Sequence, residues 1–112
     1  MQRLKSEIRV QAWVRRCAAQ GLVATVARKG EGESGALILK VNRFAAGCEV
    51  FTGVSTPEGG EAWMRASGPK PIPEKDADAY LARQAKYDPD VWVLEIEDPK
   101  AQFTLDGPIL DV

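Results

Sequence analysis

Apolar residues recur at helical spacing near the start of the chain. They follow an i, i+3, i+4, i+7 pattern at Val10, Trp13, Val14 and Cys17. This spacing predicts an amphipathic helix over about residues 7–20 with these side chains facing the core. Ser6 is a residue type that caps helix N-termini, and Gly21 is placed to end the helix.

The pattern then becomes typical of β-strands. Residues 22–27 and 36–41 are rich in aliphatic and β-branched side chains, and the segment 30–35 between them is rich in glycine. We therefore predict a β-hairpin with a mobile polar tip. After a turn at 42–47, residues 48–52 predict a third strand.

Glycine and proline divide the middle of the chain. The segment 53–60 contains turn residues and predicts a loop, which leads into a short fourth strand around residues 62–66. Three prolines lie between positions 68 and 73. Because proline disrupts helices and central strands, this segment predicts an extended connector.

A second helix is predicted over about residues 75–86, with acidic residues near its start and basic residues near its end. The clearest strand follows at 91–97. Its alternation places Trp92, Leu94 and Ile96 on one face, and Val91, Val93, Glu95 and Glu97 on the other. Residues 102–105 predict a short edge strand near the C-terminus.

The predicted element order is α-β-β-β-β-α-β, and no linker is long enough to divide the chain. We therefore expect residues 1–112 to form a single compact α+β domain with two helices. Sequential hairpins favour a mostly antiparallel sheet of four to five strands, and the crossover through the second helix would add one parallel pair.

The composition excludes several chemistries. The 112 residues contain no histidine, which excludes Ser-His-Asp and Cys-His mechanisms and histidine-ligated zinc. Cys17 and Cys48 form no CxxC pair, so we interpret them as buried thiols in a reducing compartment, with a disulfide as the less favoured alternative. The chain contains no apolar run long enough to span a bilayer and no signal-peptide pattern at its start. We expect a cytoplasmic protein without a membrane partner.

Charge is distributed unevenly along the chain, although the net charge is only -1. Residues 1–43 hold nine basic and three acidic residues (+6), whereas residues 44–112 hold six basic and thirteen acidic residues (-7). One interpretation is a basic face for an anionic partner such as nucleic acid. The other is that the two halves neutralise each other in the fold. The isoelectric point near 5.5 favours the second and argues against a nucleic-acid partner.

Two groups of residues are candidates for a functional site. The first is an arginine strip on the first helix, formed by Arg9, Arg15 and Arg16, together with Trp63, which we expect to be partly exposed beside a loop. The second is an acidic cluster around the last strand. It contains Asp88, Asp90, Glu95, Glu97 and the neighbouring Asp98. These carboxylates would bind a divalent cation if they converged, but pairing with Lys40, Arg43 or Arg28 is the favoured interpretation.

Several segments resemble the small bacterial family known as domain of unknown function 1491, found mainly in alphaproteobacteria. The resemblance covers nearly the whole chain apart from residues 53–73. It rests on residues 3–8, 15–17, 40–43, 77–84, 87–93 and 95–98. It implies a cytosolic bacterial protein of about this length. It supplies no activity, substrate, cofactor or catalytic residue.

Two functional hypotheses follow. The favoured one is a non-enzymatic binding or assembly module without a cofactor or a metal, which holds another protein or a second copy of itself through a sheet edge or the arginine strip. The alternative is a metal-dependent enzyme that acts on a phosphorylated or nucleic-acid substrate. It would use Asp88, Asp90, Glu95 and Glu97 as ligands and requires their oxygens to meet in space.

Overall fold

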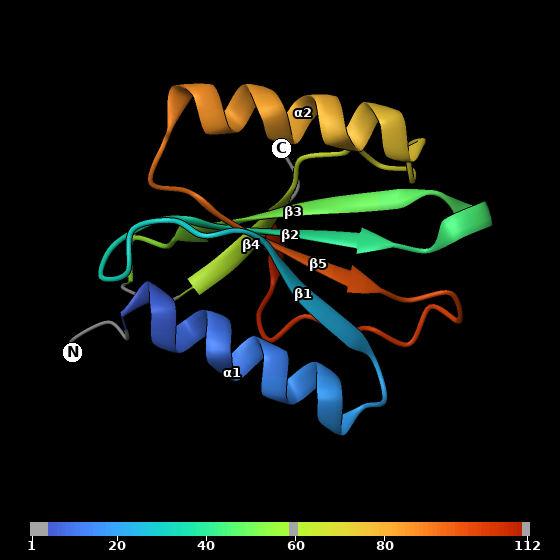
Figure 1. Cartoon of the computed structure of the whole chain (residues 1–112), viewed down its shortest axis with the longest axis horizontal. Coiled ribbons are helices and arrows are strands. Elements are labelled where there is room, and N and C mark those ends of the chain that lie inside the picture. The colour runs from blue at the N-terminus through green and yellow to red at the C-terminus, as the bar shows by residue number, and fades with distance from the viewer. Residues whose placement is uncertain (1–4, 59–60, 111–112) are drawn as a thin grey trace.

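Two helices cover opposite faces of a six-stranded mixed sheet, as Figure 1 shows. The computed structural model describes residues 5–58 and 61–110. The elements in chain order are α1 (Ser6–Ala19), β1 (Val23–Arg28), β2 (Leu37–Asn42), the short 3-10 helix η1 (Phe44–Ala46), β3 (Cys48–Ser55), β4 (Glu61–Arg65), α2 (Glu74–Tyr87), β5 (Trp92–Glu97) and β6 (Ile109–Leu110). The predicted α+β class and element order are confirmed, with one strand more than expected.

The strands lie in the order β1-β5-β2-β3-β4-β6. β5 pairs antiparallel with β1 and parallel with β2, so the parallel pair expected from the crossover is confirmed. The predicted hairpin between the first two strands is wrong, because β5 lies between them. β5 carries apolar side chains on both faces and must be covered by both layers, whereas most of β1 is exposed, as suits an edge.

The glycine-rich segment is a packed loop instead of a hairpin tip. A Cβ atom on Gly30 or on Gly35 would lie 2.2 Å from the carbonyl oxygen of Asp90, so only glycine allows this close approach. The indole nitrogen of Trp92 donates a hydrogen bond to the carbonyl of Glu31 at 2.7 Å. The loop therefore closes over the start of β5.

The same loop also begins α1. The backbone N–H groups of Ser6 and Glu7 donate to the carbonyls of Glu33 and Gly32, and the Ser6 hydroxyl donates to the carbonyl of Gly35. Ser6 is thus the first helical residue and is buried, and its side chain does not cap the helix as predicted. Backbone carbonyls from the loop satisfy the first N–H groups instead.

The side chains between α1 and the sheet form the larger apolar layer. It contains Val10, Trp13, Cys17, Leu22, Leu37, Leu39, Val41, Phe51, Trp63, Trp92, Leu94, Ile96 and Phe103. The predicted face of the last strand is confirmed by Trp92, Leu94 and Ile96. The expected partial exposure of Trp63 is wrong: it is 1% exposed, its ring meets Trp13 edge to face at 5.8 Å, and its indole nitrogen donates to Asp106.

A buried lysine joins α2 to the other face of the sheet. Lys40, at the centre of β2, is 3% exposed, and its Nζ lies 2.7 Å from Glu74, 2.7 Å from Asp78 and 3.0 Å from Glu95. Burial alone lowers the pKa of Lys40, but hydrogen bonds to Asp78, Glu74 and Glu95 outweigh this effect and raise it above its ordinary value. The ammonium group is therefore held in its charged form.

The segment after β5 is held by a buried carboxylate. Asp98 is fully buried and accepts hydrogen bonds from the backbone N–H groups of Gln102 and Phe103, with the Arg43 Nε atom at 3.4 Å. These bonds hold residues 102–105 in an irregular conformation, so the strand predicted there is wrong. The final strand is instead β6, which pairs parallel with β4.

These ion pairs join the two halves of the chain. Arg9, Lys40 and Arg43 belong to the basic first half, and all three pair with carboxylates of the acidic second half. The structure thus supports the interpretation that the two halves neutralise each other in the fold, and it argues against a continuous basic face. Neither α1 nor α2 has the length and apolar character needed to cross a membrane, and the described residues include no other α-helix.

The substitution Lys40→Met would remove the shared cation and leave three carboxylates close together. Loss of one member of a buried ion pair is strongly destabilising, and because these carboxylates retain some solvent contact we expect a loss of about 2–4 kcal/mol in the free energy of unfolding. Urea denaturation measures it. The exposed Lys86→Met is the matched control and should change stability by less than about 0.5 kcal/mol. Equal stability of the two variants would contradict the central role of Lys40.

The contribution of Lys40 should also depend on pH. Because its pKa is higher in the folded than in the unfolded chain, folding takes up a proton at alkaline pH. The stabilisation is therefore complete below about pH 10 and is lost as the pH rises through the folded-state pKa. Urea denaturation of wild type and Lys40→Met should give a constant stability difference from about pH 8 to 10 that shrinks above this range. A difference that shrinks between pH 8 and 9 would argue against the raised pKa.

Candidate functional site

The acidic cluster does not converge on one point. Asp88 and Asp90 lie in the turn before β5, where the Asp88 carboxylate accepts the N–H of Asp90 at 3.1 Å. Glu97 ends the strand, about 23 Å away along an extended chain, and Glu95 between them pairs with Lys40. The described residues contain no group of three or more acidic or cysteine side chains arranged to hold a metal ion. The arrangement required by the metal-enzyme hypothesis is therefore not found in residues 5–58 and 61–110.

Both cysteines are buried free thiols, as predicted. Burial raises the pKa of Cys17 and also that of Cys48, with the nearby cations Arg16 and Lys40 opposing the rise in part. A thiolate is the reactive form of cysteine, so both side chains are held in their unreactive state. The cationic Lys40 is likewise unsuited to act as a base or a nucleophile.

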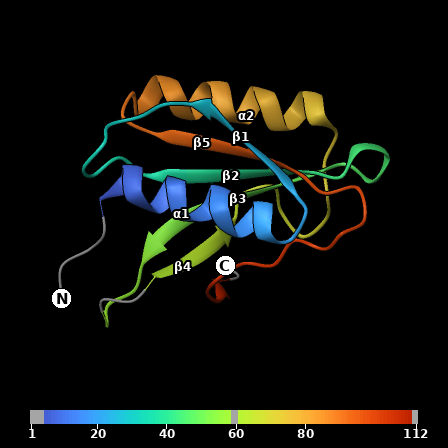
Figure 2. The ribbon, with the colours of Figure 1, turned by 60° about the horizontal axis from the view of Figure 1, so that its bottom comes forward.

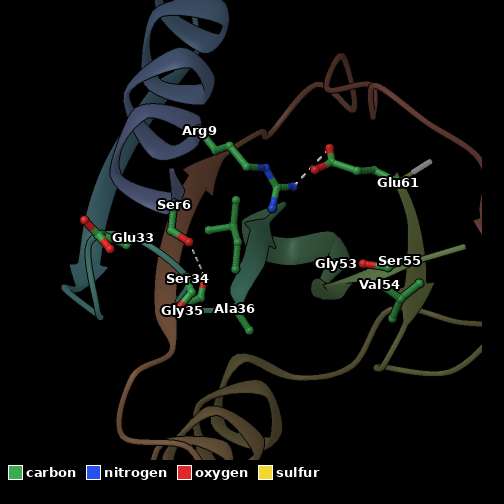
Figure 3. A pocket seen from close by; sticks show the side chains of 11 residues that line it. Ser6, Arg9, Glu33, Ser34, Gly35, Ala36, Gly53, Val54, Ser55 and Glu61 are labelled. Atoms are coloured by element: carbon green, nitrogen blue, oxygen red, sulfur yellow. Dashed lines mark hydrogen bonds and ion pairs between the residues drawn. The ribbon is translucent and has the colours of Figure 1, made fainter. Parts of the chain in front are cut away.

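A polar hollow of about 290 Å³ lies beside the first turns of α1. Segments that are distant in sequence line it: the start of α1, the loop before β2 and the end of β3. Its lining residues are Ser6, Arg9, Glu33, Ser34, Gly35, Ala36, Leu37, Gly53, Val54, Ser55 and Glu61. Figure 3 shows the Arg9 side chain reaching from α1 toward Glu61 at the start of β4. The two side chains form an ion pair at 3.4 Å.

A second hollow of about 210 Å³ lies further along α1 and is lined by Arg9, Ala12, Trp13, Arg16, Glu61 and Asp106. Arg9 and Glu61 line both hollows, so their ion pair stands between them. We call the two hollows together the α1 groove. It follows the side of α1 that faces β4 and the C-terminal segment.

The candidate residues of the arginine strip separate in the structure. Arg9 and Arg16 line the α1 groove, whereas Arg15 is exposed and lines neither hollow. The Arg16 guanidinium lies 5.0 Å from the centroid of the Trp13 ring and donates to the carbonyl of Thr104 at 3.2 Å. Trp63 packs beneath this region against Trp13 and is not itself exposed.

The α1 groove carries charges of both signs. Arg9 and Arg16 face Glu33, Glu61 and Asp106, which come from three other segments. Sequence reasoning identified the two arginines from helical spacing, but it missed the carboxylates and the serines. No local pattern signals them, because the insertion of β5 and the path of the C-terminal segment bring them to α1. The lining offers hydrogen-bond donors and acceptors for a polar ligand.

Comparison with known proteins identifies relatives. The family model described as "Protein of unknown function (DUF1491)" matches residues 4–106. No curated protein matches the chain.

Three solved structures resemble the chain along most of its length. A crystal structure of a DUF1491 family protein from Caulobacter crescentus CB15 has a TM-score of 0.84 and 38% identity, covering 96% of this chain and 100% of that one. An NMR structure of a DUF1491 family protein from the same organism has a TM-score of 0.82, with 37% identity over 99% of this chain and 100% of that one. Protein Atu0922 from A. tumefaciens has a TM-score of 0.75 and 26% identity, over 87% of each chain.

The state of the two thiols can be tested directly. We expect Cys17 and Cys48 to resist a thiol-reactive chromophore such as Ellman's reagent at neutral pH, because both are fully buried and protonated. In denaturant both should react within minutes. The measurement is absorbance against time with and without urea. Rapid reaction of either thiol in the native protein would show that it is an accessible nucleophile.

Proposed function

We propose that this chain, which belongs to the DUF1491 family of proteins of unknown function, is a non-enzymatic binding module of the bacterial cytoplasm. Its partner is another protein, and an extended segment of that partner lies in the α1 groove. The proposal is supported by one observation above all: the Arg9–Glu61 ion pair lines both hollows of the α1 groove and stands between them.

The Arg9–Glu61 pair is suited to exchange partners. The Arg9 side chain is 19% exposed and that of Glu61 is 41% exposed, so solvent already reaches both. Opening an ion pair that solvent reaches costs less than opening a fully buried one, and fully exposed pairs contribute only about 0–1 kcal/mol. A ligand that offers a carboxylate to Arg9 and an N–H donor to Glu61 would replace the internal pair with two contacts of its own.

The dimensions and charges of the α1 groove favour a polypeptide. Arg9 and Arg16 are seven residues apart, which corresponds to about 10 Å along a helix and to three residues of an extended chain. Guanidinium groups bind carboxylates through two parallel hydrogen bonds, while the opposing carboxylates and loop carbonyls accept hydrogen bonds from backbone amides. The same carboxylates, Glu33, Glu61 and Asp106, would repel a phosphate backbone, which disfavours nucleic acid.

The chemistry of the remaining side chains supports binding over catalysis. The two thiols are buried with raised pKa values, and Lys40 is held as a cation by three carboxylates. These pKa shifts hold the thiols and the ammonium group in unreactive forms. The polar side chains that line the α1 groove are arginines, carboxylates and serines. The Ser6 hydroxyl donates to the carbonyl of Gly35 and the Ser34 hydroxyl donates to the Glu31 carboxylate, whose pKa is lowered by hydrogen bonds from backbone N–H groups, so Glu31 is a weak base.

The proposal predicts that a double substitution in the α1 groove, Arg9→Gln with Arg16→Gln, abolishes partner binding. The variant loses both guanidinium groups but keeps hydrogen-bonding side chains of moderate size. The measurement is quantitative mass spectrometry of proteins retained from an alphaproteobacterial lysate by the immobilised chain. We expect a retained protein to fall at least about tenfold, equivalent to about 1.4 kcal/mol of binding free energy.

The matched control is Arg83→Gln with Lys86→Gln, which removes two exposed positive charges from α2 on the opposite layer. It should retain the same protein as the wild type, and both variants should melt within a few degrees of it. If the α1-groove variant retains every protein that the wild type retains, the α1 groove is not the binding site. If the wild type retains nothing beyond an empty support, the binding-module function is contradicted.

A further inference from the structure

β1 forms an open edge of the sheet. Among the described residues it pairs with β5 on one side and with no strand on the other. Figure 2 shows it beside β5 at the end of the sheet that is remote from β4. Unpaired backbone groups along an edge strand are a template for another strand, and natural edges are usually protected by charges, prolines or shortness.

This edge lacks most of those protections. Of the six residues of β1 only the last, Arg28, is charged, and none is proline. Two aliphatic side chains of β1 are exposed to solvent, Val23 to 57% and Val26 to 42%. β1 is six residues long, a usual strand length, and its first four residues form a regular ladder with β5. Within the described residues the opposite edge strand, β6, spans two residues and offers fewer backbone groups for pairing.

The two ends of β1 carry opposite charges. Arg28 ends the strand, and Glu97 of β5 lies directly opposite Val23 at its beginning. Within the described residues, neither Arg28 nor Glu97 has an ion-pair partner, in contrast to Lys40 and Arg43. The two are separated within one chain by about 17 Å, the length of five extended residues, so they do not pair with each other.

A β-bulge places both charges on one face. Val23 and Thr25 lie opposite Glu97 and Glu95 on the α2 face of the sheet, and regular alternation would put residue 28 on the other face. The register shifts between Val26 and Arg28, so Arg28 lies opposite Val93, which packs in the apolar layer beneath α2. The bulge therefore brings Arg28 onto the same face as Glu97.

We infer that two copies of this chain pair antiparallel through β1 and form a closed dimer with a continuous twelve-stranded sheet. Antiparallel pairing brings the Arg28 end of each strand to the Glu97 end of the other. Their backbones would be about two strand spacings, or 10 Å, apart, which these two long side chains span. The contact occurs twice about the dyad, and the partner strand places side chains beside Val23 on the α2 face and beside Val26 on the other face. This surface is separate from the α1 groove, and the inference does not depend on the proposed function.

The test is a charge exchange. Sedimentation equilibrium of the full chain between roughly 10 μM and 1 mM at low salt measures the dimer Kd. Arg28→Glu and Glu97→Arg each place like charges together at both ends of the interface, and each should raise Kd at least about tenfold. The double variant Arg28→Glu/Glu97→Arg restores opposite charges only between chains, and its Kd should return to within about threefold of the wild type.

A second variant tests the position of the strand independently of its charges. Val26→Lys places a lysine from each copy near the dyad and should yield a monomer whose melting temperature, measured at low concentration, matches the wild type. Lys86→Glu on α2 is the control and should leave Kd unchanged. A wild type that remains monomeric at about 1 mM overturns the inference. So does a dimer that tolerates both single charge reversals and Val26→Lys, or a double variant no better than the single ones.

Discussion

The burial of Lys40 is the constraint on which the α2 layer depends. An ammonium group at 3% exposure in the central part of the sheet is unfavourable unless charged partners surround it, and those partners come from two other elements. Glu74 and Asp78 belong to the first turns of α2, and Glu95 belongs to β5. The lysine thus joins the first turns of α2 to β2 and to β5. The apolar layer formed by Ile38, Cys48, Val50, Ala77, Val91 and Val93 completes that contact.

This arrangement explains part of the charge asymmetry of the sequence, because the buried Lys40 from the first half of the chain requires acidic partners, which come from the second half.

The sequence predicts the helices and strands better than it predicts which strands pair with each other. The helices, the order of the elements along the chain and the alternation of β5 follow from local periodicity, which is the same whichever strands pair. The hairpin between β1 and β2 was predicted from adjacency and turn residues, and these local signals do not distinguish a hairpin tip from a loop that crosses another strand. The distinguishing facts are nonlocal. β5 is apolar on both faces, and Gly30 and Gly35 are needed for close approach to Asp90, a residue more than fifty positions away. Similarly, the irregular segment after β5 depends on hydrogen bonds to the buried Asp98, which no periodic pattern signals.

Sequence patterns likewise predict some features of the candidate site and miss others. Helical spacing predicted that Arg9 and Arg16 lie outside the core stripe of α1, and both line the α1 groove. The spacing gave no reason to separate them from Arg15, because the distinction depends on which flank of the helix faces β4 and the C-terminal segment. Trp63 was expected at a surface because glycines and a proline precede it. Its ring instead fills the layer beneath α1, with the indole nitrogen paired to Asp106, so the polar atom of the side chain is satisfied without exposing the ring. Whether a side chain on a short strand is buried depends on the element that packs over it. Here Trp13 of α1, which is distant in sequence, packs against Trp63.

The positions of the two proposed surfaces have a further consequence for recognition. The α1 groove opens on the side of α1 that faces β4, whereas β1 lies at the other end of the strand order. Pairing through β1 would therefore leave the α1 groove of each copy uncovered, and a dimer would present two equivalent grooves related by the dyad. Binding of one segment of a partner that carries two such segments would raise the effective concentration of the second, so a weak contact at each groove would give a much tighter overall association. Hollows of about 290 and 210 Å³ are small for a high-affinity site, so a chain with such hollows gains most from that arrangement.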